Sequence, residues 1–299
     1  MDRSDAAGVS AKLPIAISIA GSDSGGGAGV QADLRTFAAL GVYGATAITA
    51  LTAQNTSGIR AIEYASPEIV AAQIKAVTED FAVAAIKIGM LGSAEIAAAV
   101  GTALGGRSAS LVGSNDRIEA FVVYDPVMAA STGEALSGAG FIEAVKEKIL
   151  PVIDCLTPNL AEAAALTGEP IARGEADMAR QGKALLALGP RAVLMKGGHL
   201  HGDEAIDLFV TSDAVHRFAA PRIGSRNLHG TGCTLSSAIA AYVVLGMSAL
   251  EAVAKAKAFV RAAIEAGCNV TLGAGVGPLI QAKLGAAPSF EASARASLS

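Results

Sequence analysis

The sequence has no tryptophan, few other aromatic residues and few cysteines. The shortage of cysteines excludes two classes of protein. Its 299 residues include no Trp, 4% aromatic residues and 3 cysteines. Cysteines so few and so widely spaced form neither a disulfide framework nor a zinc-binding motif. Residues 1–12 contain no apolar run of the kind that a signal peptide needs, so we expect a flexible N-terminal tail and a cytoplasmic protein.

Basic clusters and uninterrupted apolar runs are also missing. The formal net charge is −4, and no Lys/Arg cluster offsets it, which argues against a nucleic-acid partner. Two stretches, 38–59 and 231–250, carry few charges, but polar residues and glycines interrupt both of them. A membrane-spanning helix would have to satisfy those polar groups in lipid, so both stretches are interpreted as protein core and no membrane partner is expected.

Apolar runs of strand length alternate with helical patterns along nearly the whole chain, within a composition that is 52% hydrophobic. This alternation predicts an α/β protein in which helices cover both faces of a mainly parallel sheet. The expected strands are 13–20, 45–51, 59–64, 84–88, 120–124, 155–157 and 192–195, with a hairpin of 207–210 and 214–218. The expected helices are 30–40, 67–81, 93–104, 140–150, 161–166, 175–188, 231–244 and 248–266. We expect residues 13–285 to form a single domain, with a polar surface insertion at 105–116 and a flexible tail at 286–299.

A glycine-rich segment, GSDSGGGAGVQAD, follows the first expected strand and runs from Gly21 to Asp33. Glycines there let a ligand approach the backbone closely, although the segment is neither a P-loop nor a dinucleotide-binding fingerprint. The alternative is a tight turn between strand and helix. Asp33, in the first turns of the expected helix, has the alternative of compensating the helix dipole.

Polar side chains follow several further strands. Gln54 lies in AQNT, at the end of a strand expected to be central, and Asp125, Asn159 and Glu162 follow later strands. Ligands of open α/β sheets bind outside these strand ends, and carboxylates there suit magnesium and phosphate. The alternatives are a loop amide for Gln54, a turn for Asp125 and a helix capping box for Asn159 with Glu162.

Two further motifs indicate anion binding. Lys196 begins KGGH directly after an apolar strand, where it suits a nucleotide phosphate or, alternatively, is a solvated lysine. In NLHGTGCTLSSA, Gly230, Thr231 and Gly232 open a long helix with free N–H groups that form an anion hole. Cys233 follows in the first turn, where we expect the helix to lower its thiol pKa from about 8.5 toward neutrality. The alternative is a buried structural cysteine.

Taken in order, seven segments resemble the hydroxymethylpyrimidine/phosphomethylpyrimidine kinases of thiamine biosynthesis. They are GSDSGGGAGVQADLRTF, TALTAQNT, KIGMLG, DPVM, TPNLAEAAALTG, VLMKGGH and HGTGCTLSSAIAA, spread from Pro14 to Leu279. These enzymes belong to the ribokinase-like superfamily, as do pyridoxal kinases. The resemblance implies a three-layer α/β/α fold, a homodimer, ATP and Mg²⁺, and phosphorylation of 4-amino-5-hydroxymethyl-2-methylpyrimidine to its monophosphate and then its pyrophosphate. The alternatives are a pyridoxal or pyridoxine kinase and a non-catalytic ligand-sensing protein.

The resemblance also implies a role for each motif. Gln54 and Asp33 would bind the aminopyrimidine, in a pocket lined by Gly21, Ala28, Thr52, Met90 and Val127. Lys196, Asp125, Asn159 and Glu162 would serve the ATP phosphates, with Mg²⁺ held by Asp125 and Glu162, partly through water. Gly230 to Cys233 would form the anion hole, with Cys233 near the acceptor hydroxyl, where sugar kinases have an aspartate. Thr52, where a valine is common, and the form of the Ser24 region depart from the family pattern.

Overall fold

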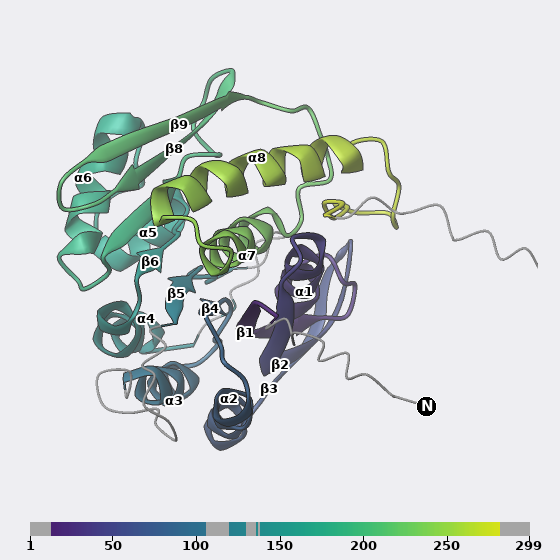
Figure 1. Cartoon of the computed structure of the whole chain (residues 1–299). Helices are drawn as coiled ribbons and strands as arrows, with labels where there is room; N and C mark the ends of the chain where they lie inside the picture. Colours follow the sequence, from purple (N-terminus) through teal and green to yellow (C-terminus); the bar gives the residue numbers. More distant parts are fainter. Residues whose placement is uncertain (1–12, 106–119, 130–135, 137, 282–299) are drawn as a thin grey trace, which may run out of the picture.

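A nine-stranded sheet forms the centre of the computed structural model, which describes residues 13–105, 120–129, 136 and 138–281 (Figure 1). Its strand order is β3-β2-β1-β4-β5-β6-β7-β8-β9. The strands are β1 Ile15–Asp23, β2 Tyr43–Asn55, β3 Gly58–Tyr64, β4 Ala85–Ile88, β5 Phe121–Tyr124, β6 Cys155–Leu156, β7 Ala192–Lys196, β8 Glu204–Val210 and β9 Val215–Pro221. Six neighbouring strands of the sheet, β2, β1, β4, β5, β6 and β7, pair in parallel. Antiparallel strands lie at both edges, β3 at one and β8 with β9 at the other. The expected mainly parallel sheet is therefore confirmed.

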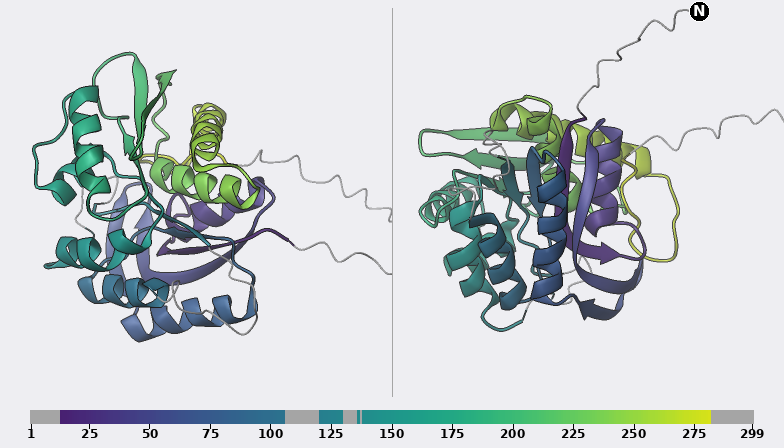
Figure 2. Two further views of the ribbon diagram at one scale, coloured as in Figure 1. Left: turned by 60° about the vertical axis from the view of Figure 1, so that its left-hand side comes forward. Right: turned by 60° about the horizontal axis from the view of Figure 1, so that its bottom comes forward.

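Helices cover both faces of this sheet, which makes the fold the expected three-layer α/β/α arrangement (Figure 2). They are α1 Gly29–Ala39, α2 Pro67–Asp80, α3 Ala94–Gly105, α4 Phe141–Ala144, α5 Leu160–Thr167, α6 Glu175–Leu186, α7 Thr231–Val244 and α8 Ala249–Gly267. One apolar core packs α2 to α6 against one face, and a second packs α1, α7 and α8 against the other. Successive β1 residues alternate between the two, since Ala16 belongs to the second core and Ile17 to the first.

Two sequence-based expectations were wrong in detail. The helix expected at 140–150 is α-helical only over α4, then continues as a π-helical turn, Val145–Ile149, and a 3-10 turn, Leu150–Val152. Pro151 lies in that last turn, where it has no N–H to continue regular α-helical hydrogen bonding. The strand that ends near Gln54, β2, is second from the sheet edge rather than central, because the edge strand β3 is its outer neighbour. The antiparallel pair of these two strands forms the β2–β3 ribbon.

The two weakly charged stretches have structural explanations within the core. Residues 38–59 contain β2, and residues 231–250 contain α7, whose middle is fully enclosed from Thr234 to Ala241. Among the helices of the described residues, none is both long and apolar enough to cross a membrane. The tails 1–12 and 286–299, and the expected insertion beyond Gly105, lie outside the described residues.

Candidate functional site

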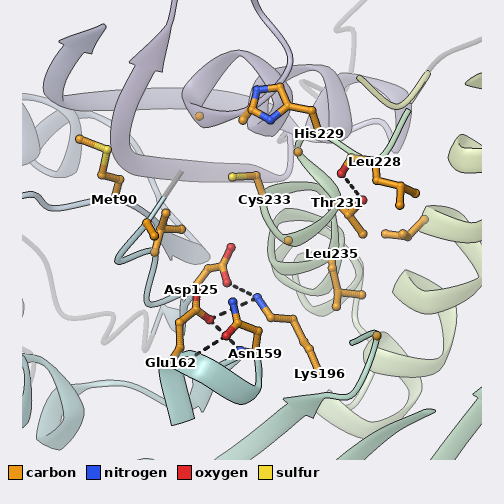
Figure 3. A pocket seen from close by; sticks show the side chains of 18 of the residues that line it. Met90, Asp125, Asn159, Glu162, Lys196, Leu228, His229, Thr231, Cys233 and Leu235 are labelled. Carbon is orange, nitrogen blue, oxygen red and sulfur yellow. Dashed lines mark hydrogen bonds and ion pairs between the residues drawn. The ribbon is translucent and has the colours of Figure 1, made fainter. Parts of the chain in front are cut away.

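A cavity of about 780 Å³ opens at the carboxyl ends of the parallel strands (Figure 3). Of the residues expected at the site, all but Asp33 line it: Gly21, Ala28, Thr52, Gln54, Met90, Asp125, Val127, Asn159, Glu162, Lys196, Gly230, Thr231, Gly232 and Cys233. They come from segments far apart in the sequence. These segments lie close together because the parallel strands end at a common edge of the sheet. The fold therefore brings the predicted constellation together.

The glycine-rich segment is organised around the carboxylate of Asp23. Its Oδ1 accepts a hydrogen bond from the Gly25 N–H (2.8 Å), and Oδ2 accepts from the N–H groups of Gly27 (3.0 Å) and Ala28 (2.9 Å). Burial alone would raise the pKa of Asp23, but the partnership with His229 and these backbone N–H groups lower it below its ordinary value. These N–H groups are thus committed within the loop, which shapes the cavity wall rather than cradling a phosphate.

Asp33 requires a correction, because it does not reach the cavity. Its carboxylate is fully buried, pairs with Lys87 Nζ at 2.8 Å, and accepts hydrogen bonds from the hydroxyls of Ser18 (2.6 Å) and Ser237 (2.7 Å). With its oxygens committed to these partners beneath the cavity floor, Asp33 is a structural anchor rather than a pyrimidine ligand. Lys87 does line the cavity. Sequence reasoning missed this lysine, although it stands at a strand end in KIGMLG.

Lys87 stays charged in spite of its complete burial. Burial by itself lowers a lysine pKa, but Asp33 chiefly, with Cys233 and Asp125, raises that of Lys87 well above its ordinary value. A permanent cation therefore stands at the floor of the cavity. Asp33 holds this cation in place.

A cluster of charged side chains occupies the opposite side of the cavity. Lys196 Nζ lies 2.6 Å from Asp125 Oδ1 and 3.8 Å from Glu162 Oε2. Glu162 and Asn159 also form the capping box of α5: the Asn159 N–H donates to Glu162 Oε2 (2.7 Å), and the Glu162 N–H donates to Asn159 Oδ1 (2.9 Å). Both interpretations of the Asn159–Glu162 pair are therefore compatible, since one pair caps a helix and lines the cavity.

Glu162 has an unusual protonation balance. Burial raises its pKa to about 7; Lys196 and the Asn159 N–H oppose this rise, and the charge of Asp125 adds to it. Two carboxylates so close together carry more negative charge than the single ammonium of Lys196 balances. Such a pair is suited to receive a cation.

The first turn of α7 packs closely against this cluster. A Cβ at Gly232 would lie 3.0 Å from Asp125 Oδ2 and 3.2 Å from Lys196 Nζ, so the absence of a side chain lets the start of the helix approach these two charged groups. Gly230 has a φ of +85°, and a side chain there would overlap the Gly27 carbonyl. The Thr231 N–H turns back to the Leu228 carbonyl (3.3 Å), so the candidates for an anion hole are the next N–H groups, those of Gly232 and Cys233.

The thiol of Cys233 differs from expectation. Burial raises its pKa to about 11; Lys87 lowers it, Asp33 and Asp125 raise it further, and the Gly29 backbone lowers it. The expected shift toward neutrality was wrong, because desolvation and two carboxylates outweigh the lysine and the backbone groups. In the ligand-free cavity the group is a thiol at neutral pH.

Sequence reasoning also missed the residues that support the KGGH turn. Asp207 Oδ1 accepts the Gly197 N–H at 3.0 Å, and Lys257 pairs with the same carboxylate. The guanidinium of Arg222 donates to the carbonyls of the 198–202 turn, namely Gly198 (2.6 Å), Leu200 and Gly202 (2.7 Å). Lys196 is thus held at the end of a strand whose following turn is fixed from two sides.

The donor set suits magnesium bound together with a phosphate ligand. The described residues contain no group of three or more His, Cys, Asp or Glu side chains placed to hold a metal by themselves. Mg²⁺ usually takes one or two carboxylates and completes its octahedron with water and substrate phosphates. Asp125 and Glu162, close to Gly232, are two carboxylates of that kind.

Comparison with known proteins gives consistent results. The family model described as phosphomethylpyrimidine kinase matches residues 23–280. A hydroxymethylpyrimidine/phosphomethylpyrimidine kinase of Rhizobium meliloti (strain 1021) is 52% identical over 265 residues, covering 89% of this chain and 96% of that protein. The crystal structure of phosphomethylpyrimidine kinase from Clostridium difficile 630 is 40% identical, with a TM-score of 0.71 over 85% of this chain and all of that one. Pyridoxal kinase from Staphylococcus aureus, solved with AMP-PCP and pyridoxal, is 31% identical, with a TM-score of 0.78 over 91% of this chain and 94% of that one.

Proposed function

Because the chain belongs to the phosphomethylpyrimidine kinase family, we propose that its cavity phosphorylates 4-amino-5-hydroxymethyl-2-methylpyrimidine twice at the expense of ATP, as thiamine biosynthesis requires. The first transfer joins the γ-phosphoryl group to the hydroxymethyl oxygen, releasing ADP and a proton. The second joins the γ-phosphoryl group of another ATP to the monophosphate, releasing a second ADP and giving the pyrophosphate. The observation that carries the proposal is the close approach at Gly232, where the α7 N-terminus, Cys233, Asp125 and Lys196 line one cavity together.

The two ends of the cavity suit the two substrates. Gln54, Met90 and Val127 offer an amide and apolar walls to a small heterocycle on the side of the glycine-rich segment. Lys196, Asn159 and the N–H groups of Gly232 and Cys233 offer positive charge and donors to phosphates. Catalysis of phosphoryl transfer is mainly positioning and charge stabilisation, which these fixed groups supply.

Asp125 and Glu162 would hold the magnesium ion, partly through water. When bound, the ion supplies positive charge that neutralises the phosphate oxygens. Lys196, beside both carboxylates, adds a second cation on the same side. These chain groups would orient the γ-phosphoryl group toward the N-terminus of α7.

Cys233 has a separate role in the first transfer, because an alcohol must lose a proton and a phosphate oxygen has none to lose. Its residue lies in the first turn of α7 and lines the cavity, so a hydroxymethyl group bound beside this turn would lie near the sulfur. The base is the minor thiolate form of Cys233, which Lys87 favours. Cys233→Ser should therefore reduce kcat for the alcohol acceptor by about 100-fold, the lower range for a lost general base. The monophosphate acceptor should lose much less. Equal losses with both acceptors would show that Cys233 only packs the site.

Pyridoxal is the competing substrate, because the fold is also that of S. aureus pyridoxal kinase. Both compounds carry a hydroxymethyl group on an aromatic nitrogen heterocycle. ATP consumption measured with the aminopyrimidine, its monophosphate and pyridoxal decides between them. We expect a higher kcat/KM for the aminopyrimidine; a preference for pyridoxal would overturn the substrate assignment.

We further propose that residues 13–285 act as one catalytic domain and that two copies of the chain form a homodimer. The match of one family model to residues 23–280 supports the first statement. Exposed apolar residues of the β2–β3 ribbon, Leu51 and Ala53 with Ala61, support the second.

A further inference from the structure

The side-chain amide of Gln54 lies between two groups whose hydrogen atoms determine which way it faces. On one side, Thr52 Oγ1 is 3.0 Å from the terminal oxygen of Gln54. On the other side, His229 Nε2 is 3.4 Å from the terminal nitrogen. All three residues line the cavity, at the end where the glycine-rich segment meets the loop before α7.

The proton of His229 can be placed from its neighbour Asp23. His229 Nε2 is 2.9 Å from Asp23 Oδ2, and an ionised carboxylate only accepts hydrogen bonds. The lowered pKa of Asp23 keeps it ionised. His229 Nε2 therefore carries a hydrogen, whether the ring is neutral or charged, and has no lone pair to offer to a Gln54 N–H group. A nitrogen of Gln54 facing it would set two donors against each other.

The proton of Thr52 can be placed in the same way. Thr52 Oγ1 lies 2.9 Å from the Ser22 carbonyl, which can only accept, so the single hydroxyl hydrogen is used there. The hydroxyl then has only lone pairs left for Gln54, and an amide oxygen facing it would set two acceptors against each other. Rotating the amide by half a turn about its last bond exchanges oxygen and nitrogen and removes both conflicts.

We propose that His229 and Thr52 hold the Gln54 amide with Oε1 toward His229 and Nε2 toward Thr52, and that this orientation selects the acceptor heterocycle. Thr52 accepts a full hydrogen bond from the Gln54 nitrogen, whereas the single Nε2 hydrogen of His229 is used at Asp23 and reaches the Gln54 oxygen only as a longer, shared contact. The inference deepens the proposed function and rests on it for the identity of the substrate. Held so, the amide keeps one N–H and one oxygen lone pair, side by side, for a ligand. A 4-aminopyrimidine offers the complementary edge, a ring nitrogen that accepts beside an amino group that donates. The amino group then lies on the His229 side and the ring nitrogen on the Thr52 side.

In this orientation Thr52 and His229 act as positioning residues. Their effect on substrate discrimination distinguishes this from a merely structural role. Pyridoxal lacks a ring nitrogen adjacent to an amino group, so it gains nothing from the fixed amide. The same holds for 5-hydroxymethyl-2-methylpyrimidine, the analogue without the amino group. Loss of either positioning residue should therefore reduce discrimination between the aminopyrimidine and its deamino analogue, while the KM for ATP stays unchanged.

The kinetic test uses the full-length enzyme and both pyrimidines. Thr52→Val should reduce the kcat/KM ratio of the two pyrimidines by about fivefold or more, which is what one ordinary hydrogen bond contributes. His229→Leu removes a longer, shared contact and should reduce the ratio by a smaller factor. His229→Gln, which places an N–H donor near the former Nε2, should restore most of the ratio. Thr46→Val, on the same strand, and His216→Leu, on β9, are controls away from the cavity lining and should leave the ratio unchanged. An unchanged ratio in Thr52→Val and His229→Leu would overturn the inference.

Neutron diffraction of the ligand-free chain tests the orientation without any assay. We expect a deuterated nitrogen of Gln54 facing Thr52 and deuterium on His229 Nε2 facing Asp23. A nitrogen of Gln54 facing His229 would overturn the inference even if the enzyme is a pyrimidine kinase. Conversely, failure of the wild-type enzyme to phosphorylate either pyrimidine would overturn the proposed function, and the neutron map would still decide the orientation of the amide.

Discussion

The thiol of Cys233 shows how strongly the surroundings of one residue control its chemistry. With a pKa of about 11, its thiolate fraction falls about tenfold for each pH unit below that value. We expect alkylation of Cys233 by iodoacetamide in the ligand-free protein to accelerate steadily from pH 7 to 10. Mass spectrometry of the Cys233 peptide measures the rate, and partly exposed Cys268 serves as the internal reference. An alkylation rate that reaches a plateau below pH 9 would contradict this prediction. It would show that the N-terminus of α7 lowers the pKa of Cys233 more than burial raises it.

The buried pair of Lys87 and Asp33 makes a second prediction at the residue scale. Lys87→Met leaves the Asp33 carboxylate buried without its cation, which should reduce the free energy of unfolding by about 3–5 kcal/mol. The double variant Lys87→Met with Asp33→Leu removes both charges and should lose less than Lys87→Met alone. Urea unfolding of the three proteins measures this coupling. A double variant less stable than the single variant would contradict this prediction. It would show that losing the hydrogen bonds from Ser18 and Ser237 to Asp33 costs more than leaving Asp33 without Lys87.

Several roles at this scale were not predictable from sequence. The motif that contains Asp33 indicates a ligand site, but only packing of α1 on the sheet decides that the carboxylate points to Lys87 under the cavity. Lys87 lies between two isoleucines in a buried strand, and nothing local distinguishes a cavity lysine from a misplaced surface residue. The Cys233 pKa depends on desolvation, which adjacent residues in the sequence do not show.

At the scale of elements, the KGGH turn depends on one glycine more than on the next. A side chain at Gly197 would overlap the Ile206 carbonyl and approach the Met178 side chain, whereas one at Gly198 meets nothing nearby. Gly197→Ala should therefore displace the turn that carries Lys196, increasing the KM for ATP by about tenfold and destabilising the protein by about 1–3 kcal/mol. Gly198→Ala is the matched control and should change both quantities little. Steady-state kinetics and thermal unfolding of the pair check this; equal effects would contradict it.

The elements themselves were largely predictable, because each carries a strong local signal. α2 begins at Ser66, whose hydroxyl accepts the Ile69 N–H, followed by Pro67 in the first turn, and α8 begins with the Ser248–Glu251 capping box. The π-helical and 3-10 turns after α4 had no such signal. There the close approach of α3 to Lys148 at Gly101 belongs to tertiary packing, which overrides the local helical pattern.

At the scale of the whole molecule, alternating strands and helices determine the layers but not the position of each strand. β2 is long and apolar enough to be interpreted as central, yet it pairs with β1 on one side and only with the β3 ribbon on the other. Its last residues extend toward the cavity and deliver Gln54 there. The order of strands in the sheet depends on the crossover connections between them. Local strand and helix patterns do not show where each crossover places the next strand. The assembly of the site, by contrast, was predictable, because the carboxyl ends of parallel strands necessarily meet.

The outer part of the β2–β3 ribbon leads to the prediction about assembly. Leu51 is 57% exposed and pairs in register with Glu63, while exposed Ala53 pairs with exposed Ala61. These exposed apolar side chains form a small patch that is interrupted by Glu63, and an apolar patch on an edge ribbon is a surface that proteins usually cover. We therefore expect light scattering to give about twice the chain mass of 29.7 kDa. Leu51→Lys should convert the dimer to a monomer, because it places a charge where the second copy would pack.

Ile171→Lys is the matched control for this change, because Ile171 is also 57% exposed but lies after α5, away from the ribbon. It should leave the dimer intact. Both variants should retain the circular dichroism spectrum and the Tm of the wild-type chain, since neither side chain belongs to the core. A wild-type monomer would contradict the homodimer itself, whereas a dimer that persists in Leu51→Lys would place the interface elsewhere on the molecule.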